Sequence, residues 1–388
     1  MDGYVRSNQS PLPPHAGKLV VFFALLTLTL LLIGRAPLQT PAPPANPSLH
    51  FVLSSVAGSP AHSLLWRTQA RLFLRHPGTR VSVLVVNDGR DSRSEEHDVC
   101  WLQVNLAPDA RNDADFVSLD ARGPACGTSG SRTTIVSLWW PNATGTAEQY
   151  GRKECALWSL AAHGLLAPVV PTDDPRDFMV RGDDDTYFIV PALRRFLQQF
   201  PPTVPQVWGR LLTPTDARLV PFLSGGAGIA VAPAVLGSLR RSPWGETAHE
   251  LWRSCSTRLE GAPTDITLAN LLARHDLYPT DSRDTHGLER FHPLELRDML
   301  RSATSVAWLS SMSRLPVTLH LSPTSVSTHY MSADAMLCLD DALFATTIDP
   351  PPPTCIAAIG LGDPLLDEYL RTVRRTLHSS SPPETAPP

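Results

Sequence analysis

Residues 178–189 have the sequence FMVRGDDDTYFI, and this stretch decides the fold class. Three consecutive carboxylates at 183–185 lie between two apolar runs, so we expect a buried strand to end near Val180 and the chain to re-enter the core at Tyr187. Charges at a strand end are costly unless a ligand needs them, and carboxylate oxygens suit the hard cations Mg²⁺, Ca²⁺ and Mn²⁺. The alternative is a solvated acidic turn, because Asp is common in turns.

Apolar runs and helical spacings alternate outward from this stretch. Because strands that alternate with helices are typical of an α/β fold, we expect a largely parallel central sheet. Such sheets bind ligands at the carboxyl ends of their strands, where the acidic cluster lies. Residues 91–134 are polar and irregular, and we expect an insertion there. The expected strands cover 49–54, 81–86, 177–180 and 229–231, and the expected helices cover 63–75, 148–163, 191–200 and 265–274, with another helix from Pro233.

Composition limits the class of protein. The chain has 388 residues and a net charge of −4, and this length suffices for one large domain or two small ones. It has no basic stripe with interleaved aromatic residues, which argues against a nucleic-acid partner. The six cysteines form no CxxC pair, so a zinc site is not expected, and their even number permits disulfides whose pairing the sequence does not determine.

The N-terminal region contains an apolar run over residues 19–33, which fits a cleaved signal peptide, a buried helix or an uncleaved anchor. Pro37 is a poor context for cleavage and begins a Pro-rich stretch, so we favour a type II anchor. The expected order is a cytosolic tail at 1–18, a transmembrane signal anchor at 19–34 and a Pro-rich stem at 35–48. A Golgi or other early-secretory membrane is the expected location, with the domain that follows the stem in the lumen.

Two further segments bear on this organisation. Asn142 begins the sequence Asn-Ala-Thr, which is a glycosylation acceptor in a lumenal protein. Residues 346–388 are rich in proline and serine, and we expect them to form a C-terminal tail outside the core.

Five short motifs follow the acidic stretch, and taken alone each has an ordinary structural explanation. Adjacent glycines in Ser-Gly-Gly-Ala-Gly at 224–228 permit a tight turn as well as close approach of a ligand. Asp265 lies in a predicted first helical turn, where an acid offsets the helix dipole. The other motifs are Asp-Ser-Arg-Asp-Thr at 281–285, Phe-His-Pro at 291–293 and Val-Ser-Thr-His-Tyr at 326–330.

Together and in this order, the motifs resemble those of the fringe and core 1 β1,3-galactosyltransferase group, most closely the core 1 synthases. Those enzymes have Asp-Asp-Asp-Thr-Tyr at a strand end, then Ser-Gly-Gly-Ala-Gly, an Asp-led helix, Asp-Ser-Arg-Asp-Thr, Phe-His-Pro and Ser-Phe-His-Tyr. This chain has each of them, with Thr328 in place of the last Phe. The resemblance covers roughly residues 49–343 and rests on motif order as well as content. It implies a GT-A type nucleotide-sugar-binding domain over 49–345.

The resemblance also implies a donor site at the end of the acidic strand. Asp183, Asp185 and His329 would bind Mn²⁺ or Mg²⁺, which holds a nucleotide diphosphate and neutralises the leaving group. Asp265 occupies the position of the general base that takes a proton from the acceptor hydroxyl. The implied donor-binding residues are Leu53, Gly151, Arg152, Asp184, Gly225, Gly226 and Tyr330.

The implied reaction is an inverting β1,3 transfer of galactose from UDP-galactose to GalNAc on Ser or Thr of a glycoprotein, by a membrane-anchored enzyme for which a homodimer is an option. Residues 294–321 contain one aromatic residue, Trp308, where the family is rich in them, so a fringe-like or other β1,3-hexosyl transfer is an alternative. A second alternative is a non-catalytic relative that acts as a chaperone for a glycosyltransferase, although such relatives lack the acidic motif. A third alternative is a calcium-binding lumenal protein, but the sequence has no second acidic cluster to supply the additional oxygen ligands that Ca²⁺ needs.

Overall fold

The structure of the chain is a computed structural model that describes part of the sequence. The described residues are 47–56, 60–87, 100–108, 114–122, 133–139, 147–166, 177–213, 221–243, 246–256, 264–312, 321–345 and 352–379. The expected anchor at 19–34, nearly all of the stem and the acceptor Asn142 lie outside these ranges. Within them, no helix has both the length and the apolar character that crossing a membrane requires.

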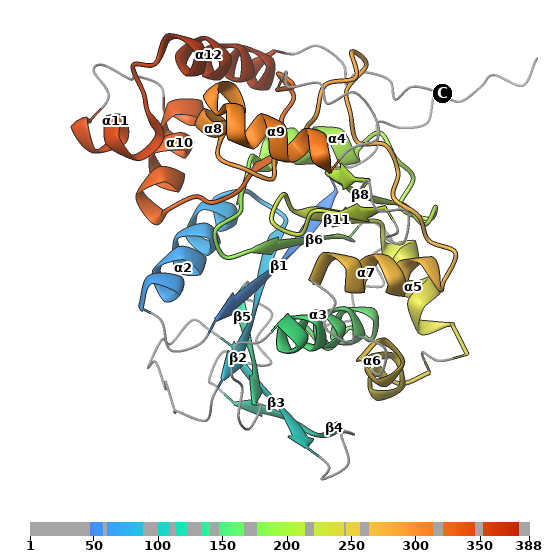
Figure 1. The fold of residues 1–388 in the computed structure, drawn as a ribbon. Helices are drawn as coiled ribbons and strands as arrows, with labels where there is room; N and C mark the ends of the chain where they lie inside the picture. Colours follow the sequence, from blue (N-terminus) through green and yellow to red (C-terminus); the bar gives the residue numbers. More distant parts are fainter. Residues whose placement is uncertain are drawn as a thin grey trace, which may run out of the picture. The chain divides into compact units, whose positions relative to one another are not determined.

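Eight described strands form one central sheet (Figure 1). They are β1 (Ser48–Val56), β2 (Thr79–Asn87), β3 (Cys100–Pro108), β4 (Ala114–Arg122), β5 (Thr133–Trp139), β6 (Asp177–Asp183), β8 (Val207–Gly209) and β11 (Ile229–Val231). Their order across the sheet is β4-β3-β5-β2-β1-β6-β11-β8. β1 pairs in parallel with β2 and with β6, whereas β4 and β11 run antiparallel to their neighbours. The sheet is therefore mixed, with a parallel centre.

Two short antiparallel pairs lie outside this sheet. β7 (Tyr187–Phe188) pairs with β12 (Ser327–Thr328), and β9 (Leu211–Leu212) pairs with β10 (Phe222–Leu223). The first pair joins the segment after the acidic turn to the last predicted motif, over a separation that the sequence pattern could not reveal.

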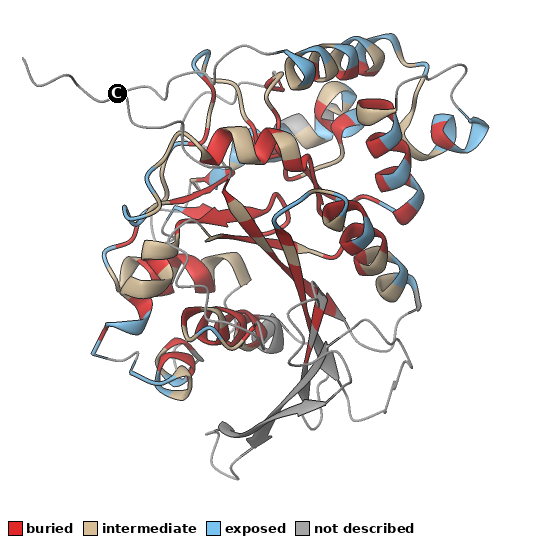
Figure 2. Cartoon of the chain, turned by 180° about the vertical axis from the view of Figure 1, so that it is seen from behind, coloured by how far each residue is buried: buried red, intermediate tan, exposed pale blue. Residues whose placement is uncertain are grey.

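The central strands are buried on both faces, as Figure 2 shows. Leu49, Phe51 and Leu53 of β1 belong to one core cluster, and Val52 belongs to the other. This alternation follows from the two-residue period of a strand. Because both faces need apolar side chains, β1 and β6 each contain an uninterrupted run of three hydrophobic residues, Phe51 to Leu53 and Phe178 to Val180.

Helices cover the two faces of the sheet (Figure 1). α3, α5, α6 and α7 contribute to one core cluster, and α2, α4, α10 and α12 contribute mainly to the other. Their bounds, with those of the remaining helices, are α2 (Pro60–Leu74), α3 (Ala147–Ala162), α4 (Val190–Leu197), α5 (Pro233–Arg240), α6 (Ala248–Ser256), α7 (Thr264–Ala273), α8 (Leu296–Arg301), α9 (Ala303–Ser311), α10 (Ala333–Phe344), α11 (Pro353–Ile359) and α12 (Pro364–His378).

The C-terminal region corrects the tail that we expected at 346–388. Leu366, Leu370 and Val373 of α12 are buried in the same core cluster as β1. A disulfide between Cys338 and Cys355 joins α10 to α11. The proline content misled the expectation, because the first turns of both α11 and α12 contain proline, where its missing N–H costs no helical hydrogen bond.

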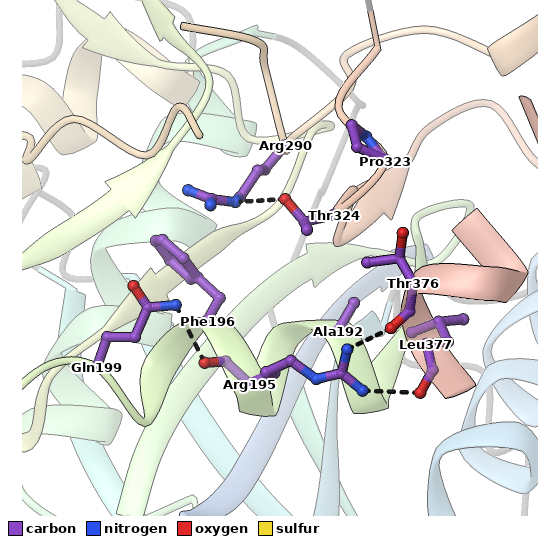
Figure 3. A pocket seen from close by; sticks show the side chains of 9 residues that line it. All are labelled: Ala192, Arg195, Phe196, Gln199, Arg290, Pro323, Thr324, Thr376 and Leu377. Carbon is purple, nitrogen blue, oxygen red and sulfur yellow. Dashed lines mark hydrogen bonds between the residues drawn. The ribbon is translucent and has the colours of Figure 1, made fainter. Parts of the chain in front are cut away.

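Arg195 on α4 fixes the end of α12, as Figure 3 shows. Its guanidinium donates to the carbonyl oxygens of Thr376 at 2.6 Å and Leu377 at 2.7 Å. Carbonyls in the last helical turn have no partner within the helix, so a cation there satisfies them and complements the helix dipole. None of the predicted site residues lines the hollow drawn in that figure.

Residues 91–134 also differ from the expected irregular insertion, because they include β3, β4 and the start of β5. Leu102, Val104 and Leu106 alternate with polar residues, and this two-residue period was the signal that the expectation missed. The three strands extend the sheet beyond β2.

Candidate active site

The acidic cluster lies at the carboxyl end of β6, a strand that has neighbours on both sides in the sheet. Asp183 is the register partner of Ser54 in β1, and the N–H of Asp184 donates to the Ser54 carbonyl oxygen at 3.2 Å. The chain then turns, because the N–H of Thr186 donates to the Asp183 carbonyl oxygen at 3.1 Å. The Thr186 hydroxyl also donates to the Gly226 carbonyl oxygen at 2.9 Å, which joins the turn to the glycine motif.

Asp183, Asp185 and His329 come together at this turn. One ligand atom of each lies within 4.8 Å of the others. His329 Nε2 is 3.0 Å from Asp185 Oδ1 and 4.0 Å from Asp183 Oδ2. The pairing of β7 with β12 explains the meeting, because it places residue 329 beside the turn that precedes β7.

The chemistry of this donor set fits the implied cation. His329 Nδ1 lies 3.1 Å from the carbonyl oxygen of Pro293. A carbonyl oxygen only accepts, so Nδ1 carries a proton, and Nε2 is the ring nitrogen that faces the two carboxylates and would bind the cation. Two carboxylates and one imidazole suit Mn²⁺ and leave coordination positions for phosphate oxygens.

The third carboxylate, Asp184, turns away from this cluster. Its Oδ2 accepts from the Ser55 hydroxyl at 2.7 Å and lies 2.7 Å from His62 Nδ1. The residue is buried, and burial raises the pKa of its carboxyl group. Asp184 is one of the implied donor-binding residues, and in the structure one of its oxygens contacts Ser55 of β1 and His62 of α2.

Asp265 lies in the first turn of α7, beside the glycine motif. A backbone hydrogen bond from Gly225 reaches its carboxylate. Burial raises the pKa of Asp265 to about 6, although the neighbouring Arg181 acts in the opposite direction. A carboxylate with a pKa close to neutral is suited to accept a proton at physiological pH.

The two adjacent glycines make room for the functional side chains. A Cβ on Gly226 would lie 2.1 Å from His329 Cε1, and a Cβ on Gly225 would lie 2.6 Å from Asp265 Oδ1. The glycine motif therefore leaves room for both side chains. It also forms the tight turn that its sequence allowed, because the N–H of Gly228 donates to the Gly225 carbonyl oxygen at 2.9 Å.

Comparisons with known proteins agree with this arrangement. Residues 171–351 match the family model described as Fringe-like. Glycoprotein-N-acetylgalactosamine 3-beta-galactosyltransferase 1 of Xenopus laevis is 26% identical over 170 residues, which are 42% of this chain and 44% of that protein. The chain thus aligns with less than half the length of this curated relative, which is a glycosyltransferase, the class predicted for this chain.

A solved structure was also found. It is mannosyltransferase PcManGT from Pyrobaculum calidifontis in complex with GDP-Man and Mn²⁺, with 14% identity and a TM-score of 0.28 over 95% of this chain and 96% of that one.

Tyr330 borders the cluster of candidate metal ligands in a strained conformation. Its φ is 58°, which is uncommon for a residue with a side chain. Its ring centroid lies 3.9 Å from that of His329, and the residue is 56% exposed. Strain of this kind persists where the surroundings enforce it, and the N–H of Met331 helps by donating to the Asp185 carbonyl oxygen at 2.9 Å.

Three of the implied donor-binding residues lie on β1 and α3, outside the range that the family model matches. Leu53 has no exposed surface, and its side chain packs in the hydrophobic core. Gly151 is buried in α3, and Arg152 is half-buried on the same helix.

Asp284, in the motif at 281–285, has a structural role. Its Oδ1 accepts from the backbone N–H groups of His286 at 2.9 Å and Leu288 at 2.8 Å, and its Oδ2 accepts from the Ser322 hydroxyl at 2.7 Å. Asp281 forms an ion pair with Arg283 at 2.6 Å. These contacts make both acids weaker candidates than Asp265 for a base.

The sequence did not single out four residues around the cluster: His62, Lys153, Glu154 and Arg181. Lys153 is buried, and although Asp183 raises its pKa, the stronger effect of burial lowers it. A signal existed, because Lys153 and Glu154 are adjacent charges on the otherwise apolar side of α3. Charges in such positions are almost never buried unless they are paired.

Proposed function

We propose that the chain is an inverting, metal-dependent β1,3-glycosyltransferase that moves galactose from UDP-galactose to GalNAc on Ser or Thr of glycoproteins. The observation that carries the proposal is the meeting of Asp183, Asp185 and His329 at one end of β6, with Asp265 beside the adjoining glycines. A bound divalent cation would neutralise the charge of a leaving diphosphate there.

The residues of the chain supply the rest of the reaction. Asp265 takes the proton of the acceptor hydroxyl while that oxygen forms a bond to the anomeric carbon of the sugar. The bond from the anomeric carbon to the diphosphate breaks, and UDP leaves. One displacement inverts the anomeric centre, and a single carboxylate with a pKa of about 6 suffices as the base. Ser55 and His62 hold Asp184 away from the cation site, which leaves two carboxylates for the cation.

A donor screen tests this proposal. The lumenal part of the chain is incubated with Mn²⁺ and UDP-galactose, UDP-GlcNAc, UDP-GalNAc or UDP-glucose, with and without a GalNAc-bearing peptide, and released UDP is measured. We expect transfer from UDP-galactose, loss of transfer with EDTA, and a β-linked product by NMR of the anomeric proton. Absence of UDP release with every donor would refute the activity.

The second candidate function is β1,3 transfer with a different donor sugar or a different acceptor. Residues 294–321 contain one aromatic residue, Trp308, which is 39% exposed on α9. Aromatic side chains commonly form the apolar platform for a sugar ring. UDP release that needs another UDP-sugar, or another acceptor glycan, would favour a fringe-like or other β1,3-hexosyl transfer.

We also propose that the domain lies in the lumen of the Golgi or another early-secretory compartment. Disulfides Cys155–Cys255 and Cys338–Cys355 support an oxidising environment.

A further inference from the structure

The guanidinium of Arg181 lies beneath the candidate site and contacts acids on two elements. Arg181 is 2% exposed. Its Nε donates to Glu154 Oε1 at 3.1 Å and its Nη2 to Glu154 Oε2 at 2.9 Å. The same Nη2 lies 3.0 Å from Asp183 Oδ1. One planar cation therefore joins an acid of α3 to a candidate metal ligand at the end of β6.

The remaining nitrogen of this guanidinium points toward the candidate base. Nη1 is buried and has no hydrogen-bond partner among the described residues. It lies 2.9 Å from the position that a Cβ on Gly225 would occupy, and Asp265 Oδ1 lies 2.6 Å from the same position. Arg181 and Asp265 thus both lie against Gly225.

The strand geometry explains why one residue reaches all three acids. Residues 181 and 183 are two apart in β6, so their side chains leave the same face of the sheet. That face is the one covered by α3 and α7, which carry Glu154 and Asp265. Trp158 Nε1 donates to Glu154 Oε1 at 2.9 Å and holds this carboxylate in place.

We propose that Arg181 is a positioning residue that holds the carboxylates of Asp183 and Asp265 in their reactive arrangement. The inference rests on the proposed function. A guanidinium is suited to this role because its nitrogens form a rigid planar fork, whereas a lysine ammonium is a point charge on a flexible stem. The competing explanation is an ion pair that only attaches α3 to β6.

The experiment compares two variants with a control at the other end of the same strand. Arg181→Lys keeps the charge but not the fork. The double variant R181Q/E154Q removes both charges together, because removing one partner leaves an uncompensated buried charge and risks unfolding. The control, R80Q/D177N, removes the ion pair between Arg80 and Asp177 at the start of β6.

Each variant is measured for thermal melting, for UDP affinity with Mn²⁺ by calorimetry, and for kcat and acceptor KM. We expect all three to fold, and both Arg181 variants to lose about 10²-fold in kcat, because a displacement of about 1 Å in a reactive group can cost that much. Acceptor KM should change little, whereas UDP affinity with Mn²⁺ should fall about 10–100-fold, because Arg181 also orients the candidate metal ligand Asp183. The control should retain the wild-type kcat.

The pH profile supplies a readout that a purely structural role would not move. Asp265 is faced by Arg181 and Asp183 from β6, by Glu154 from α3 and by Tyr330 after β12. Arg181 acts on it more strongly than Glu154 does, so R181Q/E154Q should move the acidic limb of kcat to higher pH.

Three outcomes decide the matter. Wild-type kcat in folded Arg181→Lys overturns the proposal while leaving the glycosyltransferase activity standing. If R181Q/E154Q does not fold, the kcat of Arg181→Lys alone tests the proposal, since this variant keeps the buried positive charge. A wild-type chain that transfers no sugar overturns the proposed function and this inference together.

Discussion

A methyl group at Gly226 would lie 2.1 Å from Cε1 of His329, closer than real Cβ contacts allow. The nearest atoms belong to the imidazole ring of His329, whose Nδ1 already donates a hydrogen bond to the carbonyl oxygen of Pro293. The ring therefore cannot turn aside without losing that hydrogen bond. Glycine at 226 is in this way a condition for the arrangement of the three candidate ligands, and not only a turn residue.

Gly226→Ala should consequently weaken Mn²⁺ binding about 10–100-fold, the usual cost of disturbing a group that orients a metal ligand. Calorimetric titration with Mn²⁺ measures the loss. Gly237→Ala on α5 is the matched control, because its Cβ meets the flexible guanidinium of Arg241 at 3.0 Å. Equal Mn²⁺ affinity of wild type and Gly226→Ala would contradict the placement of His329.

Asp185→Ala should abolish metal-dependent UDP binding, since the diphosphate charge would lose its cation. Calorimetry of UDP with and without Mn²⁺ tests this. Asp341→Ala, an exposed acid on α10, is the control and should bind UDP like the wild type. Unchanged affinity in Asp185→Ala would rule out its role as a ligand.

Asp265→Asn should lower kcat by about 10²–10⁴-fold, the usual contribution of a general base, while UDP affinity persists. The wild-type kcat should fall as the pH drops below about 6, because the carboxylate is then protonated. Near-wild-type transfer by Asp265→Asn would reassign the base.

Asp265→Asn should make the folded protein more stable at neutral pH, although it lowers kcat. The pKa of Asp265 is raised by folding, so its charged form opposes folding increasingly as the pH rises from the usual value of about 3.9 through about 6. Asp265→Asn should therefore unfold at a higher temperature than wild type at pH 7, and the difference should vanish near pH 4. Equal melting temperatures at pH 7 would argue against the raised pKa.

At the scale of elements, α12 is the least expected part of the fold. Its buried face completes the core cluster that contains β1 and α4, and Arg195 holds its end. Asp363 caps the N-terminus of α12, because its side chain accepts from the N–H of Leu365 at 3.0 Å. The C-terminal segment thus belongs to the domain in which the candidate site is built.

Leu370→Ala should lower the free energy of unfolding by about 2–5 kcal/mol, because it leaves a cavity in a packed core. Leu365→Ala on the same helix is the control, since Leu365 is 56% exposed and Leu370 is 5% exposed. Urea denaturation followed by tryptophan fluorescence measures both variants. Equal midpoints would show that α12 does not pack as described.

At the scale of the whole molecule, the described domain places its candidate site on the carboxyl edge of a parallel sheet centre, which is the usual position in α/β folds. Residues that are far apart in the sequence meet there. They come from β1, α3, the end of β6, the glycine motif with α7, and the segment after β12.

The anchor proposed at 19–34 concerns the molecule as a whole. N-terminal sequencing of the chain produced in secretory cells should find no new terminus near Ala36, because Pro37 disfavours cleavage. A mature chain that begins there would replace the anchor by a cleaved signal peptide.

Local sequence determined the elements and the residue types of the candidate site. A strand or helix follows from the spacing of apolar residues, so β1, β2, β6 and α7 could be predicted from short windows. The alternation in β3 was missed, and α12 was hidden by its proline-rich neighbours. Motif order then indicated the family to which residues 171–351 are similar.

Only the tertiary structure decided which of these side chains meet. Asp185 and His329 are 144 positions apart, and their contact depends on the pairing of β7 with β12. The three adjacent aspartates look equivalent in sequence, yet Ser55 and His62 withdraw Asp184 while Arg181 holds Asp183. Such contacts depend on long-range packing and on the burial of charge, neither of which leaves a periodic signal in the chain.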